Sequence, residues 1–197
     1  MKKLSVTNKT RRLAETAIMI ALSVVLSEIP IIKLPYGGSV TLFSQLPLVV
    51  ISYRYGVKWG VFSGFVMGVI QMLLGLENFS WVSGIVAYLI LIFADYIVAF
   101  GALGLGGIFR KSVKNQAISL AVGGAVVSII RFVCHYISGV TIWKSYAEDM
   151  PAALYSLIYN GSYMSLELLF TVVGAVIVGT LFDFTSAEIK VKKKIKK

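Results

Sequence analysis

Apolar segments long enough to enter a lipid bilayer take up most of this chain of 197 residues. Hydrophobic side chains make up 57% of the sequence and charged ones only 14%, which excludes a soluble domain of ordinary composition. Because a membrane-spanning helix needs about 20 mostly apolar residues, the pattern predicts an all-α membrane protein with six transmembrane helices. The predicted spans cover residues 13–29, 40–53, 57–76, 82–109, 117–140 and 151–182.

Basic residues set the orientation of these helices. Of the 19 lysines and arginines, 16 cluster before the first span, in every second connection and in the tail, whereas the other connections are neutral to acidic. By the positive-inside rule both termini are cytoplasmic. The sequence therefore predicts a basic N-terminus (1–12), a membrane domain (13–183) and a basic tail (184–197) in a multi-pass protein of the cell membrane. We expect the basic residues to meet lipid head groups rather than nucleic acid.

Four ionisable side chains, Asp95, Arg131, His135 and Glu167, fall inside the predicted spans. Such a group at the centre of a membrane helix costs about 2.5–3.5 kcal/mol on insertion scales, so it normally faces a protein interior or a wet cavity. A polar pocket inside the bundle is the prediction. The alternatives are a structural ion pair between Asp95 and Arg131, a hydrogen-bonded core histidine, and a structural or gating role for Glu167.

Helical periodicity gathers polar and aromatic residues onto shared faces. Trp81, Tyr88 and Asp95 are spaced by seven, and Arg131 precedes His135 by one turn. A carboxylate beside aromatic faces suits a flat organic cation, because the ring quadrupole and the acid both attract positive charge. The last predicted span adds a polar strip of Ser156, Asn160, Tyr163 and Glu167, and the outer loop region adds Trp143, Tyr146 and Tyr155.

Enzymatic chemistry has little support in the sequence. No HExxH, GxSxG or GxxxxGK[ST] motif occurs, and one histidine with one cysteine is too little for a metal centre. We therefore expect no catalytic residue, metal or cofactor, and we interpret Cys134 as a small packing residue. Gly60, Gly64 and Gly68, at four-residue spacing, predict a ridge on which another helix packs closely.

Four stretches of the sequence are similar to a known family. They are YGGSVTLFSQLPLVVISYRYGVKWG (36–60), ADYIVAF (94–100), RFVCHYISGVTIWKSYA (131–147) and ALYSLIYNGSYM (153–164). In order and spacing they resemble the thiamine-specific substrate-binding (S) subunits of energy-coupling-factor (ECF) transporters. The resemblance extends from residue 13 to about residue 180.

This resemblance implies a six-helix subunit that captures thiamine from outside, in a pocket under the loop joining the first two helices. It also implies a membrane coupling subunit and two cytoplasmic ATPases as partners, with the coupling subunit docking on a stripe of Ala14, Ala17 and Ala21. In that family the acid and the asparagine hydrogen-bond the ligand and the tryptophan stacks on a ring. The implied pocket residues are Asp95, Tyr96, Arg131, His135, Trp143, Tyr155 and Asn160, to which the helical periodicity adds Trp81 and Tyr88.

The chain also departs from the family pattern. Gly38 and Leu42 stand where some relatives have tryptophan and glutamate, and Met67 stands where another tryptophan is found. Trp81 or Tyr36 could supply the missing ring. High-affinity thiamine uptake is the predicted function. The alternatives are a subunit for another flat vitamin or a hydroxymethylpyrimidine, a solitary proton-coupled carrier, and a purely structural membrane protein.

Overall fold

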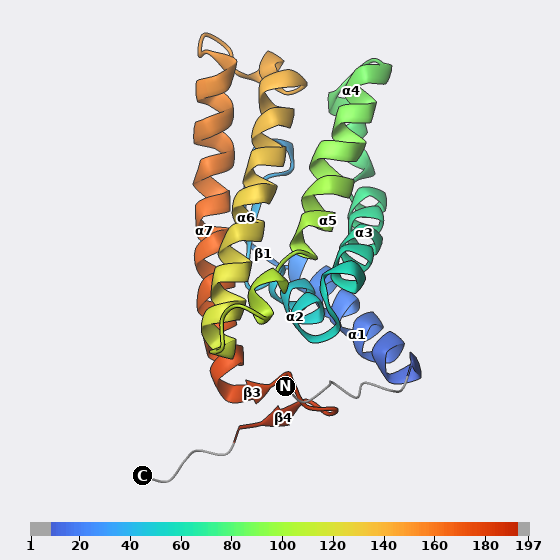
Figure 1. The fold of residues 1–197 in the computed structure, drawn as a ribbon. Coiled ribbons are helices and arrows are strands. Elements are labelled where there is room, and N and C mark those ends of the chain that lie inside the picture. Colours follow the sequence, from blue (N-terminus) through green and yellow to red (C-terminus); the bar gives the residue numbers. More distant parts are fainter. Residues whose placement is uncertain (1–8, 193–197) are drawn as a thin grey trace.

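Helices make up most of the computed structural model, which describes residues 9–192 (Figure 1). The basic residues predicted to flank the membrane at 1–8 and 193–197 lie outside the described part of the chain. Short 3₁₀ turns connect the larger elements. They are η1 (Pro35–Gly37), η2 (Leu76–Trp81), η4 (Ile108–Arg110) and η5 (Lys144–Tyr146). The helices are α1 (Lys9–Ser27), α2 (Leu46–Tyr55), α3 (Val57–Leu74), α4 (Ile85–Ile90), the π-helical η3 (Leu91–Val98), α5 (Ala99–Leu103), α6 (Gln116–Thr141) and α7 (Ala152–Leu181).

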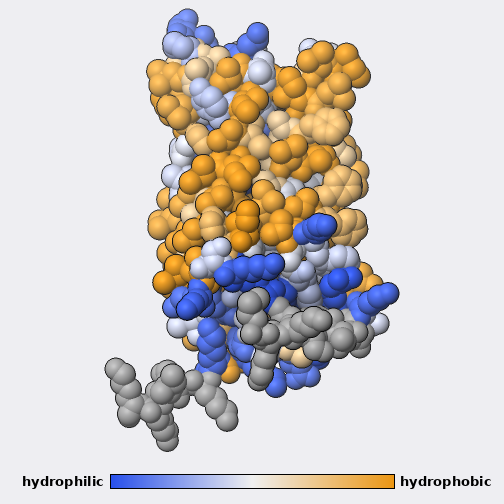
Figure 2. Space-filling model, viewed as in Figure 1, coloured by the Kyte–Doolittle hydropathy of each residue, from blue (hydrophilic) through white to orange (hydrophobic). Residues whose placement is uncertain are grey.

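Four helical stretches of the described chain are long and apolar enough to cross a membrane. Figure 2 shows the matching surface, an apolar belt between two more polar ends. The first two predicted spans do not reach this standard, because α1 carries several charges in its first turns and α2 has only ten residues. Six crossings therefore remain a prediction. The four stretches are Val57–Leu74, Ile85–Arg110, Gln116–Thr141 and Ala152–Leu181.

The predicted helix over 40–53 is wrong at its start. Strand β1 (Pro30–Lys33) pairs antiparallel with β2 (Ser39–Thr41), so the connection after α1 is a hairpin, and α2 begins only at Leu46. The chain is held extended at Thr41, whose backbone N–H and hydroxyl both donate to the Glu167 carboxylate. The Glu167 side chain, on α7, thus holds the backbone of β2 in place, although the two segments are more than a hundred residues apart in the sequence.

The glycine ridge of α3 packs as predicted. A Cβ on Gly60 would lie 2.4 Å from the Gly104 carbonyl oxygen, and one on Gly64 would lie 2.4 Å from that of Phe100. A Cβ on Gly68 would lie 2.8 Å from the backbone carbonyl oxygen of Tyr96. These distances leave no room for a side chain, so the ridge lets α3 pack against η3 and α5 backbone to backbone.

Arg54 joins the two ends of the described chain on one side of the molecule. Its side chain is buried, with 2% of the residue exposed, and pairs with Glu15 of α1 at 2.5 Å. It also donates to the backbone oxygens of Phe184, Ser186 and Ala187. These residues lie in the turn between β3 (Phe182–Asp183) and β4 (Lys190–Val191), so α1, α2 and this C-terminal hairpin meet at one end (Figure 1).

Candidate functional site

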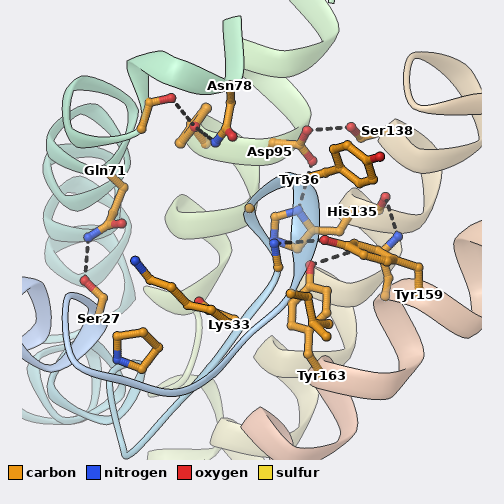
Figure 3. Close-up of a pocket in the computed structure, with 18 of the residues that line it drawn as sticks. Ser27, Lys33, Tyr36, Gln71, Asn78, Asp95, His135, Ser138, Tyr159 and Tyr163 are labelled. Carbon is orange, nitrogen blue, oxygen red and sulfur yellow. Dashed lines mark hydrogen bonds and ion pairs between the residues drawn. The ribbon is translucent and has the colours of Figure 1, made fainter. Parts of the chain in front are cut away.

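A cavity of about 390 Å³ lies at the other end of the molecule, among the β1–β2 hairpin, η2, η3, α6 and α7. Figure 3 shows its lining, in which carboxylate, imidazole, amide and phenol groups point inward from different elements. Its volume falls in the range of small-molecule sites. The predicted polar pocket therefore exists in the structure.

Asp95 is the centre of the hydrogen bonding in this cavity. Its Oδ1 lies 2.9 Å from His135 Nδ1, and its Oδ2 accepts from the Ser138 hydroxyl at 2.5 Å. The Trp143 indole N–H donates to the same Oδ2 at 3.4 Å. Both side chains of the His135–Asp95 pair are mostly buried, with 12% and 13% exposed. Acid, imidazole and indole from three segments therefore meet at one point.

The alternative of a structural ion pair between Asp95 and Arg131 is not found among the described residues. His135 takes that place, and the Arg131 guanidinium lies 4.5 Å from the centre of the Phe100 ring. Arg131 Nε and His135 Nε2 are buried without a hydrogen-bond partner in the described structure. Because an unpaired buried polar atom is costly, these two atoms are ready to bind a polar ligand.

Two residues of the polar strip on α7, Asn160 and Glu167, have different roles. Asn160 donates to the backbone oxygen of His135 at 3.2 Å and accepts from the Tyr163 hydroxyl at 3.0 Å, which fixes the wall next to the imidazole. Glu167, with 3% exposed, accepts from Thr41 and from the Gln45 amide at 2.9 Å. Its carboxylate is thus occupied in holding the hairpin and the start of α2, which agrees with a structural role.

Aromatic rings line the cavity beside the tip of the β1–β2 hairpin. Tyr36, at the tip of the hairpin, contacts Trp81 with ring centroids 5.5 Å apart and Tyr146 at 4.3 Å. Trp143 lies 5.8 Å from Tyr146. Tyr36 has a φ of +61°, an uncommon value for a side chain of this size, and the following Gly37 has +92°. The tight turn brings the Tyr36 ring down over the cavity.

Comparison with known proteins identifies the family. Residues 13–185 match the family model described as thiamine transporter protein (Thia_YuaJ). The chain belongs to this family. It is therefore a transporter protein rather than an enzyme, and a multi-pass protein of the cell membrane.

Individual relatives agree with the family match. The chain is 36% identical over 165 residues to the thiamine transporter ThiT of Bacillus subtilis, covering 78% of this chain and 82% of the relative. It is 32% identical over 184 residues to ThiT of Lacticaseibacillus paracasei, covering 85% and 84%. The solved structure of ThiT from Listeria monocytogenes superposes with a TM-score of 0.70 at 25% identity, over 87% of this chain and 94% of that one.

Most of the residues expected in a binding site line this cavity. Tyr88 does not, because its ring stacks on Phe79 at 6.0 Å instead. Ala14, Ala17 and Ala21, which were predicted to contact a coupling subunit, are exposed on α1, outside the cavity. The expected residues that line it are Trp81, Asp95, Tyr96, Arg131, His135, Trp143, Tyr155 and Asn160.

The three departures from the family pattern lie in different surroundings. Gly38 lines the cavity, Leu42 is exposed outside it, and Met67 is buried in the core. Tyr36 and Trp81 both line the cavity, so each is placed to supply a ring.

Sequence reasoning missed several residues of the lining. Ser138 lies three positions after His135, so helical spacing alone could have placed it on the same face. Tyr159 lies four positions after Tyr155 on α7, so the same spacing could have placed it there. Lys33 had no comparable signal, because the hairpin that carries it was expected to be an irregular loop.

Proposed function

We propose that this chain captures thiamine at the outer face of the membrane, as the substrate-specific subunit of an ATP-driven ECF transporter. The observation that carries the proposal is the meeting of Asp95, His135 and Trp143 around one cavity. Family membership supports it, because the relatives are named thiamine transporters.

Thiamine joins an aminopyrimidine to a positively charged thiazolium ring, and the cavity offers a group for each part. The Asp95 carboxylate balances the positive charge or accepts from the aminopyrimidine, and the Trp143 ring stacks on a ligand ring. His135, Ser138 and Trp143 already hold the carboxylate in place, so the ligand meets an acid that needs little reorganisation. Arg131 and Asn160 complete the polar wall.

Energy for transport comes from partner proteins in this proposal. The chain has no phosphate-binding GxxxxGK[ST] loop, whereas α1 exposes Ala14, Ala17 and Ala21 on one side. Small side chains allow another helix to approach closely, so this stripe is the proposed contact with a membrane coupling subunit that works with two cytoplasmic ATPases. The chain crosses the membrane six times in this arrangement, with both termini in the cytoplasm.

Calorimetric titration of the purified protein with thiamine tests the proposal. We expect the wild type to bind thiamine. In the Asp95→Asn variant the free energy of binding should be weaker by about 1–3 kcal/mol, because a charged hydrogen-bond acceptor is removed from a mostly buried site. Asp149→Asn is the matched control, since Asp149 is exposed in the loop before α7 and does not line the cavity. Equal thiamine affinity in all three proteins would remove Asp95 from the site.

A further inference from the structure

Arg12 lies on α1, at the end of the molecule where α1, α2 and the C-terminal hairpin meet (Figure 1). Its guanidinium lies 4.0 Å from the centre of the Trp59 ring, in the first turn of α3. The Trp59 indole N–H donates to the Thr16 hydroxyl at 2.9 Å, and Thr16 follows Arg12 by one turn. Because this hydrogen bond holds the ring against α1, the Arg12 guanidinium lies on a fixed aromatic surface.

The charge of Arg12 is not balanced by an ion pair with any described residue. Two acids at this end of the molecule already have partners, since Glu15 pairs with Arg54 at 2.5 Å. Glu188 pairs with Arg11 at 3.2 Å. Arg12 forms no hydrogen bond within the described chain, and its Nε is buried without a partner. Its two amino groups reach the surface, so an acceptor from outside the chain can bind them.

The surface next to this guanidinium is cationic on one side and apolar on the other. Lys58 is exposed in the first turn of α3, next to Trp59. Phe62 follows one turn later, with its ring centroid 5.6 Å from that of Trp59. Phe62 and Phe65 are 54% and 46% exposed. In Figure 2 the polar end of the molecule borders the apolar belt in the same way. A partner that fits this surface is anionic at one end and apolar at the other.

We propose that Arg12 and Lys58 bind the phosphate of an anionic phospholipid, whose acyl chains lie along Phe62 and Phe65. The planar guanidinium donates two parallel hydrogen bonds to phosphate oxygens, and the lysine ammonium adds a second charge. Tryptophan is common at the boundary between head groups and acyl chains, which is where the proposal places Trp59. The lipid belongs to the leaflet at this end of the molecule.

The surroundings favour an anionic lipid over a zwitterionic one and over a protein. A choline or ethanolamine ammonium would need an acid, but Glu15 and Glu188 are already paired. The alanine stripe proposed for the coupling subunit lies two, five and nine residues after Arg12, so it does not share a helical face with it. The inference does not depend on thiamine capture, because neither Arg12 nor Lys58 lines the ligand cavity.

Native mass spectrometry of the full chain in detergent, titrated with phosphatidylglycerol or phosphatidylcholine, tests the proposal. We expect the wild type to bind phosphatidylglycerol more tightly. Arg12→Gln should weaken phosphatidylglycerol binding about fivefold and leave phosphatidylcholine binding unchanged. Lys58→Gln should weaken it in the same direction, although it leaves the contact between Arg12 and Trp59 intact. Lys111→Gln is the matched control, because Lys111 is an exposed lysine outside this surface.

Three results would overturn the lipid site. Phosphatidylglycerol affinity could be unchanged in both Arg12→Gln and Lys58→Gln. Lys111→Gln could weaken it equally, which would show an effect of net charge alone. Millimolar inorganic phosphate could displace the lipid, which would show an anion site that does not need acyl chains. Thiamine affinity should be the same in Arg12→Gln and wild type, so failure of thiamine capture is scored separately.

Discussion

At the scale of single residues, the Tyr159 hydroxyl joins α7 to the outer hairpin. It accepts from the backbone N–H of Gly38 at 3.0 Å and donates to the backbone oxygen of Pro35. These two groups flank Tyr36 and Gly37, the turn that covers the cavity. One phenol therefore fixes the position of the aromatic cover.

Replacing Tyr159 with phenylalanine should make ligand release faster. The change removes both hydrogen bonds, each with a net value of about 0.5–1.5 kcal/mol, but keeps the ring. Stopped-flow tryptophan fluorescence would measure the dissociation rate constant of thiamine. Tyr136→Phe is the control, because no hydrogen bond of the Tyr136 hydroxyl is found in the described structure. An unchanged rate in Tyr159→Phe would show that the hairpin is held by other contacts.

The sequence predicted the centre of the site but not its surroundings. Asp95, Arg131 and His135 were identifiable because ionisable groups are costly in apolar helices, and Trp143 through the family resemblance. The prediction that Tyr88 shares a face with Asp95, seven residues later, was wrong because Leu91–Val98 is π-helical. A π-helix turns less per residue than an α-helix, so residues spaced by seven no longer share a face.

At the scale of elements, the contact between α3 and the η3–α5 helix depends on the absence of side chains at three glycines. Gly64→Ala would place a methyl group 2.4 Å from the Phe100 carbonyl oxygen, and backbone cannot move aside as a side chain can. We expect a loss of about 1–3 kcal/mol in unfolding free energy, the usual cost of overpacking.

Unfolding of the purified variants in detergent measures this effect. Gly101→Ala is the matched control, because a Cβ there has open space around it and alanine favours a helix. It should be neutral or slightly stabilising. A Gly64→Ala protein as stable as the wild type would mean that the helices can separate without cost.

Element boundaries were predictable where apolar runs end at clear signals. The predicted spans 117–140 and 151–182 became α6 (Gln116–Thr141) and α7 (Ala152–Leu181). The hairpin was not predictable, since the groups that hold it, Glu167 and Tyr159, lie far away in the sequence. Local pattern carries no information about such long-range hydrogen bonds.

At the scale of the whole molecule, the orientation in the membrane is predicted from the charge distribution, and cysteine labelling can test it. The chain has one cysteine, Cys134, and it is buried, so background labelling should be low. A membrane-impermeant maleimide should label Lys144→Cys in intact cells. Lys111→Cys should react only after the cells are made permeable. The reverse pattern would place the cavity on the cytoplasmic side and contradict capture from outside.

The contacts of Arg54 have a consequence for how the protein is made. Its helix leaves the ribosome early, but three of its acceptors, the backbone oxygens of Phe184, Ser186 and Ala187, are synthesised after all the long helices. Until then the guanidinium has only Glu15 and Tyr55 as side-chain partners. The end of the molecule that holds Arg54 is therefore completed as a late step of biogenesis, and a nascent chain that stops before residue 184 carries an incompletely bonded arginine.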